Sequence, residues 1–426
     1  MAGHKKITMS RVVLLCILLF NAASLLAQKE CATTTYQEEL IKKHPSLLPD
    51  ITAANSFTTT TRNEVVMSGP GSPDGLVPVI TIPVVVHILY KEQHENISDA
   101  QVLSQIDALN AAFSLQHADT SRIPSYFRGL AANTRIEFRL AKVDPKGYAT
   151  NGIVRKNTWV TMYGIDERIK YSDQGGDDAW DSDKYLNIWV GNLAGGIAGY
   201  SSVIGGPKHL DGVTIRYSAF GTTGSVAGPY DKGATAVHEV GHWLGLRHIW
   251  GDAYCGDDGV DDTPPQRSAN RGCPSGIKQS CGSSPYGDMY MNYMDLTSDG
   301  CMLMFTAGQM NRMRSMFAPG GPRNKLLSSN GYNGVAIPAP VAAPEVIIPE
   351  VKLLDVYPNP AQSILVVDMK ESTELTGHDL QIINQFGQRV KTVKLTQAKT
   401  NIHVSGLAKG VYFIRIGRHQ QKFMKL

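Results

Sequence analysis

Three histidines and a glutamate stand at spacings that suit a metal centre. His238, Glu239, His242 and His248 form the pattern H-E-x-x-H-x-x-G-x-x-H. Side chains four positions apart lie on one face of a helix, so His238 and His242 would project toward a common point. Two imidazoles placed in this way suit a tetrahedral zinc ion. Glu239 would polarise a water molecule at the metal and would not itself bind the ion.

The third histidine depends on the glycine that precedes it. Gly245 can adopt the left-handed conformation that ends a helix, so the chain can turn there and bring His248 to the metal. Three protein ligands leave a fourth coordination position open, which distinguishes a catalytic zinc site from a structural one. A short H-E-x-x-H match can also arise in an ordinary helix, but the added glycine and third histidine favour the zinc site.

Composition and the N-terminal residues indicate an exported protein. A length of 426 residues is enough for two or three domains. The chain is 42% hydrophobic and 19% charged, and its net charge of +3 is too small to indicate binding to nucleic acid. Residues 1–27 begin with a basic stretch, continue with a short apolar run and end in small residues, which is the order of a secretory signal peptide. No later segment is long and apolar enough for a transmembrane helix, so we expect a soluble, exported mature protein.

Cysteine usage agrees with export. The four residues Cys255, Cys273, Cys281 and Cys301 follow the histidine motif, and an even set of four allows three pairings. Cys31 is left over near the start of the mature chain.

Residues 28–62 have the composition of a propeptide. They are polar and threonine-rich, with one helical patch around residues 36–43, and cannot build a core of their own. Cys31 could occupy the open zinc position as a thiolate and keep a zymogen inactive, or it could be an unpaired cysteine with no role. Arg62, which ends a run of threonines, is the processing point that we expect.

Alternating strands and helices would position the motif. We expect strands at 79–90, 136–141, 186–190 and 211–215, a helix that begins at a capping box at Ser98, and the motif helix from near Gly233. His87, inside the first strand, is more typical of a packed core residue than of a metal ligand. Residues 197–203 would form an exposed edge strand that can bind an extended peptide.

An acidic loop follows the motif. Asp257, Asp258, Asp261 and Asp262 lie within six residues and would repel one another unless a cation lay among them. Oxygen ligands on a loop suit calcium, and the alternative is a solvated acidic turn.

A second domain follows a Pro/Ala-rich linker at residues 332–350. Residues 351–426 contain short alternating strands separated by turn signals, a pattern typical of a small β-sandwich, and no catalytic constellation.

Residues 78–330 resemble the pappalysin family of metzincins, close to its bacterial ulilysin-type members. Besides the histidine motif, the resemblance rests on residues 82–87, on the run D-G-V-D-D-T-P at 258–264, on the Met-turn candidate at 292–295, and on residues 299–313. It implies an α+β fold: a twisted mixed sheet with helices above an irregular lower lobe. The zinc metalloprotease domain would then span residues 63–331.

The resemblance also implies roles for individual residues. His238, His242 and His248 would bind zinc, Glu239 would be the general base, and Met294 would lie beneath the metal. Calcium would lie near Asp258, Asp261 and Thr263. The implied disulfides are Cys255–Cys281 and Cys273–Cys301. The family favours cleavage before Arg or Lys, for which Asp299 is the candidate here; the alternative is a solvated loop aspartate.

One position departs from the family pattern. The family usually has a tyrosine two residues after the Met-turn methionine, and Leu296 stands there in this chain. Loss of such a donor to the tetrahedral intermediate costs on the order of a hundredfold in turnover.

The last residues resemble C-terminal sorting domains of Bacteroidetes type IX secretion cargo. The resemblance rests on residues 356–360, 406–412 and 422–426, and it implies passage through outer-membrane secretion machinery. The whole sequence therefore predicts a secreted or cell-surface zinc endopeptidase made as a zymogen, with protein or peptide substrates. The alternative is a weakly active or inactive surface-binding or adhesion protein on a metalloprotease fold, which the Leu296 departure favours and an intact Glu239 opposes.

Overall fold

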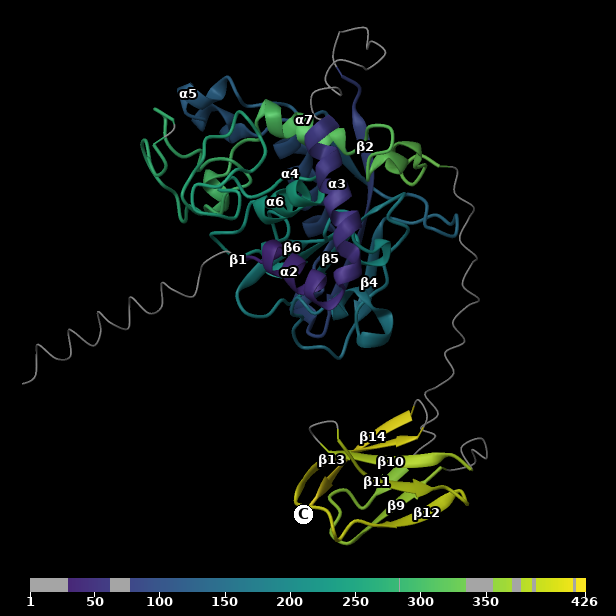
Figure 1. The fold of residues 1–426 in the computed structure, drawn as a ribbon. Coiled ribbons are helices and arrows are strands. Elements are labelled where there is room, and N and C mark those ends of the chain that lie inside the picture. The colour runs from purple at the N-terminus through teal and green to yellow at the C-terminus, as the bar shows by residue number, and fades with distance from the viewer. Residues whose placement is uncertain are drawn as a thin grey trace, which may run out of the picture. The chain divides into compact units, whose positions relative to one another are not determined.

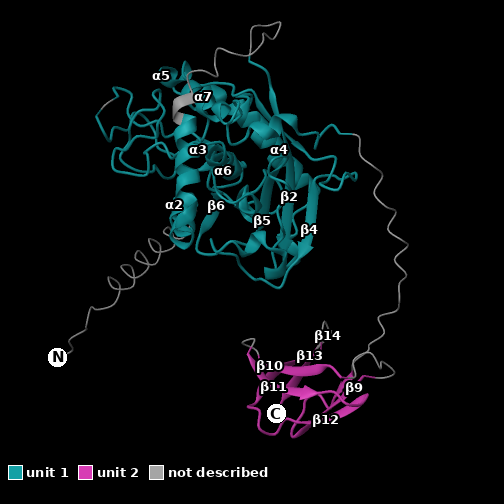
Figure 2. Ribbon diagram, turned by 45° about the vertical axis from the view of Figure 1, so that its right-hand side comes forward, with its two compact units in different colours: residues 1–339 teal, residues 340–426 magenta. Residues whose placement is uncertain are grey.

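The computed structural model describes residues 30–61, 77–282, 284–334, 355–369, 377–384, 388–416 and 419–426. The predicted signal peptide, Arg62 and most of the predicted linker lie outside these residues. The chain divides into two compact units, residues 1–339 and 340–426, at a boundary inside the predicted linker (Figure 2). None of the described helices is long and apolar enough to cross a membrane.

A seven-stranded mixed sheet is the centre of the first unit (Figure 1). Its strands are β1 (Glu30–Cys31), β2 (Ile80–Tyr90), β3 (Ile136–Leu140), β4 (Ile153–Asn157), β5 (Leu186–Gly191), β6 (Ile197–Ser201) and β7 (Val213–Arg216). The order is β1-β6-β7-β5-β2-β3. Strand β4 also pairs with β2, farther along that strand than β3 does. Strands β2, β3, β4, β5 and β7 are parallel, β6 is antiparallel to β7, and β1 is parallel to β6. This is the predicted α+β mixed sheet.

The helices of this unit are α2 (Thr33–Lys43), α3 (Leu48–Thr61), α4 (Asp99–Phe113), α5 (Ser125–Arg128), α6 (Ala234–Trp243) and α7 (Ala307–Ser315). Short 3-10 helices lie at Pro45–Leu47, Gln93–Glu95, Ala118–Arg122, Arg168–Lys170, Ser172–Gln174, Lys208–Leu210, Tyr217–Ala219, Asp299–Cys301 and Asn324–Ser328. Ser98 accepts a hydrogen bond from the Gln101 N–H at the start of α4, as the capping box predicted.

Both faces of the sheet are covered. Nine of the eleven residues of β2 are buried, which is typical of a parallel strand with elements packed on each side. Helices α4 and α6 share a hydrophobic core with the sheet. His87 is fully buried in β2, with Nδ1 2.7 Å from Asp177 and Nε2 3.1 Å from Asn187, so it is a core residue as predicted.

The prediction missed strand β4. Of its residues Ile153–Asn157 only the first two are apolar and none is fully buried, so the hydrophobic pattern that marks the other strands is too short to recognise.

Residues 30–61, here called the N-terminal arm, cross the domain as β1, α2 and α3. The prediction of one helical patch was incomplete, because Leu48–Thr61 also forms a helix. Threonines are weak helix formers, but tertiary contact overrides propensity here: α3 lies against α7, and the side chains of Ile51 and Thr58 are buried. Strand β1 extends the sheet at β6, so the arm itself covers the predicted exposed edge.

An irregular region follows α6 and ends at α7. Two disulfides, Cys255–Cys281 and Cys273–Cys301, join its loops, and these are the pairs that the resemblance implied. Asp295 is buried and accepts hydrogen bonds from Gln266 and Asn270. Burial raises the pKa of Asp295 to about 6 although these bonds lower it.

The second unit contains two antiparallel sheets. One has the order β11-β10-β13-β14 and the other β12-β9-β8. The strands are β8 (Asp355–Tyr357), β9 (Ile364–Asp368), β10 (Asp379–Asn384), β11 (Arg389–Lys394), β12 (Lys399–His403), β13 (Gly410–Ile416) and β14 (His419–Lys425). Alternate residues such as Leu365, Val367, Ile414 and Ile416 form its core, as the strand pattern predicted.

Candidate metal centre

Helix α6 carries the first part of the motif and is buried along its whole length. It begins after Gly233, whose φ of 73° is left-handed. The Asp299 carboxylate accepts the backbone N–H groups of Lys232 and Ala234 at 3.0 and 3.1 Å. A carboxylate at a helix N-terminus stabilises the unpaired N–H groups and the helix dipole. Asp299 therefore holds the start of the motif helix.

The three histidines converge. His242 Nε2 lies 3.1 Å from His238 Nε2 and 3.1 Å from His248 Nε2. Tetrahedral zinc with nitrogen ligands at about 2.0–2.1 Å sets neighbouring nitrogens about 3.3 Å apart. These residues therefore fit a zinc ion. His248 reaches this position because Gly245, with φ of 94°, ends the helix as predicted.

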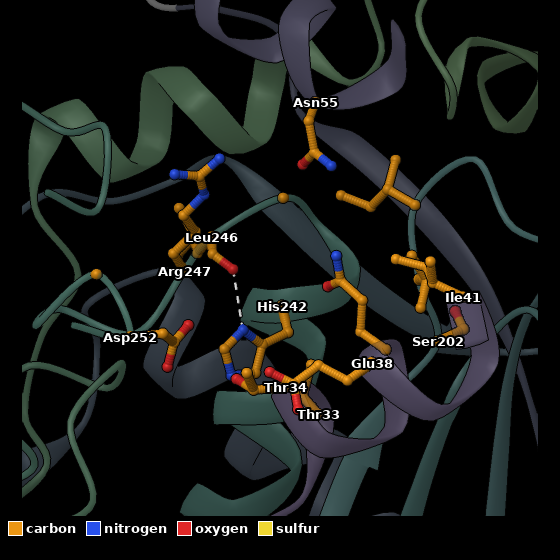
Figure 3. A pocket seen from close by; sticks show the side chains of 15 residues that line it. Thr33, Thr34, Glu38, Ile41, Asn55, Ser202, His242, Leu246, Arg247 and Asp252 are labelled. Carbon is orange, nitrogen blue, oxygen red and sulfur yellow. Dashed lines mark hydrogen bonds between the residues drawn. The ribbon is translucent and has the colours of Figure 1, made fainter. Parts of the chain in front are cut away.

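Each histidine is oriented through its other nitrogen. The Nδ1 atoms lie 2.6 Å from the Tyr293 carbonyl for His238, 2.9 Å from the Leu246 carbonyl for His242 (Figure 3), and 2.5 Å from the Asp252 carboxylate for His248. A carbonyl can only accept, so the Nδ1 atoms of His238 and His242 carry the protons. Their Nε2 lone pairs then point at the metal position, as metal ligands require.

Sequence reasoning missed Asp252 and Trp250. Asp252 is four residues after His248. Burial alone would raise its pKa, but the hydrogen bond with His248 and the nearby charges of His248 and His242 together outweigh burial, so the pKa is lowered. The Trp250 ring stacks on His248 with a centroid distance of 4.2 Å. A carboxylate four residues after the third histidine was the signal available in the sequence.

Two glycines make room for the site. A Cβ atom at Gly241 would lie 2.6 Å from Met294 Sδ, so a glycine inside α6 lets the Met-turn approach the helix. A Cβ atom at Gly199 would lie 2.9 Å from Glu239 Cγ. Met294 is fully buried, as implied for a residue beneath the metal.

The N-terminal arm reaches the same centre. Cys31 Sγ lies 3.6 Å from His242 Nε2 and 3.7 Å from the Glu239 carboxylate. Cys31 and the three histidines offer four ligand atoms within 4.8 Å of one another, and this is the one such group of His, Cys, Asp and Glu among the residues that the structure describes. The Thr33 hydroxyl donates to Glu239 at 2.8 Å and accepts the Ser201 N–H at 2.9 Å. Sequence reasoning missed Thr33.

A cavity of about 320 Å³ lies between the arm and the domain beside His242 (Figure 3). Its wall on the arm side includes Thr34, Glu38 and Asn55, and its wall on the domain side includes Arg247 and Asp252. The arm thus covers this space without filling it.

The acidic loop does not gather its carboxylates. Asp258 is buried and accepts hydrogen bonds from the Thr263 hydroxyl and the Val260 N–H, whereas Asp261 is exposed. Asp262 accepts bonds from Thr306 and Gly308 at the start of α7. Burial raises the pKa of Asp258 to about 7.

Leu296, at the position of the family tyrosine, is buried. The neighbouring Tyr293 makes other contacts. The Tyr293 ring packs against Phe305 with a centroid distance of 4.9 Å, and its carbonyl is the group that contacts His238. Burial raises the pKa of Tyr293, and the charge of Asp299 adds to the rise.

Known proteins share these features. Residues 170–318 match the family described as pregnancy-associated plasma protein-A, and residues 355–426 match the secretion system C-terminal sorting domain. An extracellular metalloprotease of Pyricularia oryzae is 46% identical over 142 residues, which cover 32% of this chain and 49% of that protein. One of Colletotrichum graminicola is 30% identical over 251 residues, 52% of this chain and 86% of that protein. The chain spans about half the length of the first curated relatives that it matches.

Solved structures agree with the fold. Mature mirolysin of Tannerella forsythia in complex with a cleaved peptide is 46% identical, with a TM-score of 0.58, covering 61% of this chain and 97% of that one. A promirolysin mutant from the same organism is 42% identical, with a TM-score of 0.64, covering 70% and 97%. The sorting domain and the extracellular relatives indicate secretion or the cell surface. The chain belongs to the pappalysin family of metalloproteases.

Proposed function

We propose that this protein is a secreted zinc endopeptidase made as an inactive precursor. The observation that carries the proposal is the convergence of three histidine Nε2 atoms beside the buried Glu239. Residues 28–62 are the propeptide, 63–331 the catalytic domain, and 351–426 the domain that directs passage across the outer membrane. The substrates are proteins or peptides.

The residues of the centre divide the chemistry among them. His238, His242 and His248 hold zinc, which supplies Lewis-acid activation of water and carbonyl groups when bound. Glu239 takes the proton of the attacking water and passes it to the leaving amine. Strand β6 holds the peptide in extended form through its backbone edge, once the arm has left it.

The arm keeps the precursor inactive at two points. Burial, with the Glu239 charge adding to it, raises the pKa of the Cys31 thiol, so a thiolate at this position needs a cation beside it. Zinc held by the three histidines would be that cation, and Cys31 would be a further ligand to it. The Thr33 hydroxyl donates a hydrogen bond to Glu239, the proposed general base. The arm therefore keeps water away from Glu239 as well as from the metal.

The proposal also includes a substrate preference and a calcium site. Asp299, at the start of the motif helix, favours substrates with Arg or Lys after the cleaved bond. Calcium binds near Asp258, Asp261 and Thr263. Support for calcium comes from the burial of Asp258, whose raised pKa marks a carboxylate that a nearby cation would stabilise.

The test compares the full chain without residues 1–27 with its Glu239→Ala variant, both loaded with zinc and followed by mass spectrometry. We expect cleavage near Arg62 in the parent alone, and its loss with a zinc chelator. If neither protein cuts itself and the parent stays inert on unfolded proteins after the arm is removed, the enzyme proposal fails and surface binding is the remaining function.

A further inference from the structure

Tyr36 fastens the arm to the domain one helical turn after Thr33. Its side chain is 1% exposed, and its ring lies 5.0 Å from the Tyr200 ring, centroid to centroid. The Tyr36 hydroxyl donates to Glu167 Oε1 at 3.0 Å and lies 3.5 Å from Lys170 Nζ. Every one of these partners belongs to the domain and none to the arm.

The domain side of this contact is a built pocket. Lys170 is 1% exposed and donates to the Leu210 carbonyl at 2.7 Å. Its ammonium lies 5.2 Å from the Trp189 ring and 5.5 Å from the Tyr200 ring, while Tyr36 supplies a third ring at 4.9 Å. Burial lowers the pKa of Lys170 to about 8, so the group is still mainly charged at pH 7. The pocket thus offers one aromatic wall, the Tyr200 ring, and the Lys170 cation, which also contacts Trp189.

Glu167 is held in an unusual conformation to reach the phenol. Its φ of 69° is left-handed, which is costly for a residue with a side chain. It is 8% exposed, so its carboxylate is nearly out of water. A buried carboxylate without a donor is strongly disfavoured, and the phenol hydroxyl supplies a donor in the present structure. Departure of Tyr36 would leave an acceptor facing an empty aromatic pocket.

The pocket lies on the opposite face of β6 from the zinc centre. A Cβ atom at Gly199 would touch Glu239, so position 199 faces α6. Successive residues of a strand point to opposite faces, which places Tyr200 on the other side. A ligand in the pocket therefore does not compete for the metal position.

We propose that Glu167, Lys170 and Tyr200 form a binding site for a tyrosine side chain, separate from the catalytic cleft. Tyr36 fills the site in the precursor, and a tyrosine of a protein substrate fills it once the arm has gone. The carboxylate selects the hydroxyl, and the Tyr200 ring and the Lys170 cation select the aromatic ring, so phenol is bound more tightly than benzene or toluene. The second occupant rests on the proposed removal of the arm, whereas the first does not.

The first experiment uses the full chain and needs no peptidase activity. Tyr36→Ala vacates the pocket whether the arm stays or detaches, and Tyr36→Phe keeps it filled by a ring. We expect p-cresol, the side chain of tyrosine, to bind the Tyr36→Ala chain in saturation-transfer NMR about tenfold more tightly than toluene, because a hydrogen bond to a charged group is worth about that factor. Neither the parent nor Tyr36→Phe should bind p-cresol.

A Glu167→Gln change in the Tyr36→Ala chain should reduce the preference for p-cresol over toluene to about twofold. Equal binding of the two compounds before this change, or p-cresol binding to the parent, would overturn the proposal. Circular dichroism checks that each variant is folded.

The second experiment uses the processed parent, after the arm has been cut and removed. N-acetyl-L-tyrosinamide should bind this form and not the precursor, and N-acetyl-L-phenylalaninamide should bind about tenfold more weakly. If the chain neither processes itself nor cuts unfolded proteins after the arm is removed, the proposed function fails, but the p-cresol result still decides the pocket. If the processed protein is active and ignores the tyrosine amide, the pocket is only a dock for Tyr36 and the substrate role is wrong.

Discussion

The histidine motif and the acidic loop look alike in the sequence but differ in the fold. Both cluster potential metal ligands within a few residues, at 238–248 and at 257–263. The histidines sit on a buried helix and the turn after it, and their Nδ1 atoms contact oxygen atoms that leave the Nε2 atoms facing one point. The carboxylates sit on a loop, where Asp258 and Asp262 accept backbone and hydroxyl hydrogen bonds instead. Spacing predicts a site when a rigid element fixes the directions of the side chains, and is weaker evidence on a loop.

The largest effect should separate the two clusters directly. His248→Ala removes one of the three histidine ligands of zinc, so the full chain should lose most of its zinc and, once the arm is removed, all measurable activity. Asp258→Asn should keep one zinc ion per chain. Metal content after dialysis measures both, and equal zinc loss in the two variants would contradict the assignment of the histidines.

The acidic loop makes a pH-dependent prediction. The pKa of Asp258 is about 7 in the folded protein and about 3.9 in an unfolded chain, so the folded state binds the proton more tightly. Without calcium, Asp258 should therefore lower stability progressively as pH rises from about 4 to 7, by a few kcal/mol at most. Urea unfolding at several pH values measures this. The slope should become shallower in Asp258→Asn, where the part due to Asp295 remains, and also in the parent with calcium if the loop binds it.

A change at Asp252 tests whether the orientation of His248 by a neighbouring carboxylate contributes to zinc affinity. Asp252→Asn keeps an acceptor and tolerates the left-handed φ of 55°, but it removes the charge facing His248. Zinc affinity should fall about tenfold, at the weak end of the effects seen for groups behind metal ligands. Competition with a fluorescent chelator measures the affinity; an unchanged value would show that the Trp250 contact and the turn alone hold His248.

The smallest effect concerns the arm. Thr33→Val keeps the shape but removes the hydroxyl that binds Glu239, so the precursor should process itself several-fold faster, and Cys31 should react faster with an alkylating reagent. Thr35→Val is the matched control, because Thr35 is exposed on the same helix. The proposed second point of inhibition is wrong if the two variants behave alike.

Local patterns could predict much of the fold and the ligands. The spacing of His238 and His242, the glycine before His248 and the cap at Ser98 depend on residues within one or two helical turns. Distant contacts could not be predicted in this way. Thr33 contacts Glu239, which is 206 positions away in the sequence. Position 199 needs a glycine because a Cβ atom there would touch the side chain of Glu239 in helix α6. Helix α3 was missed for the same reason, because its partner α7 is about 250 residues away.

The pairing of β1 with β6 has a consequence for solubility. An exposed strand edge is a template on which other chains can add, and it is a common origin of aggregation. The arm occupies the β6 edge in the present structure, so a neighbouring chain cannot add a strand there. The arm therefore also protects the sheet from aggregation, and under the proposed function the edge becomes available only after the arm is removed.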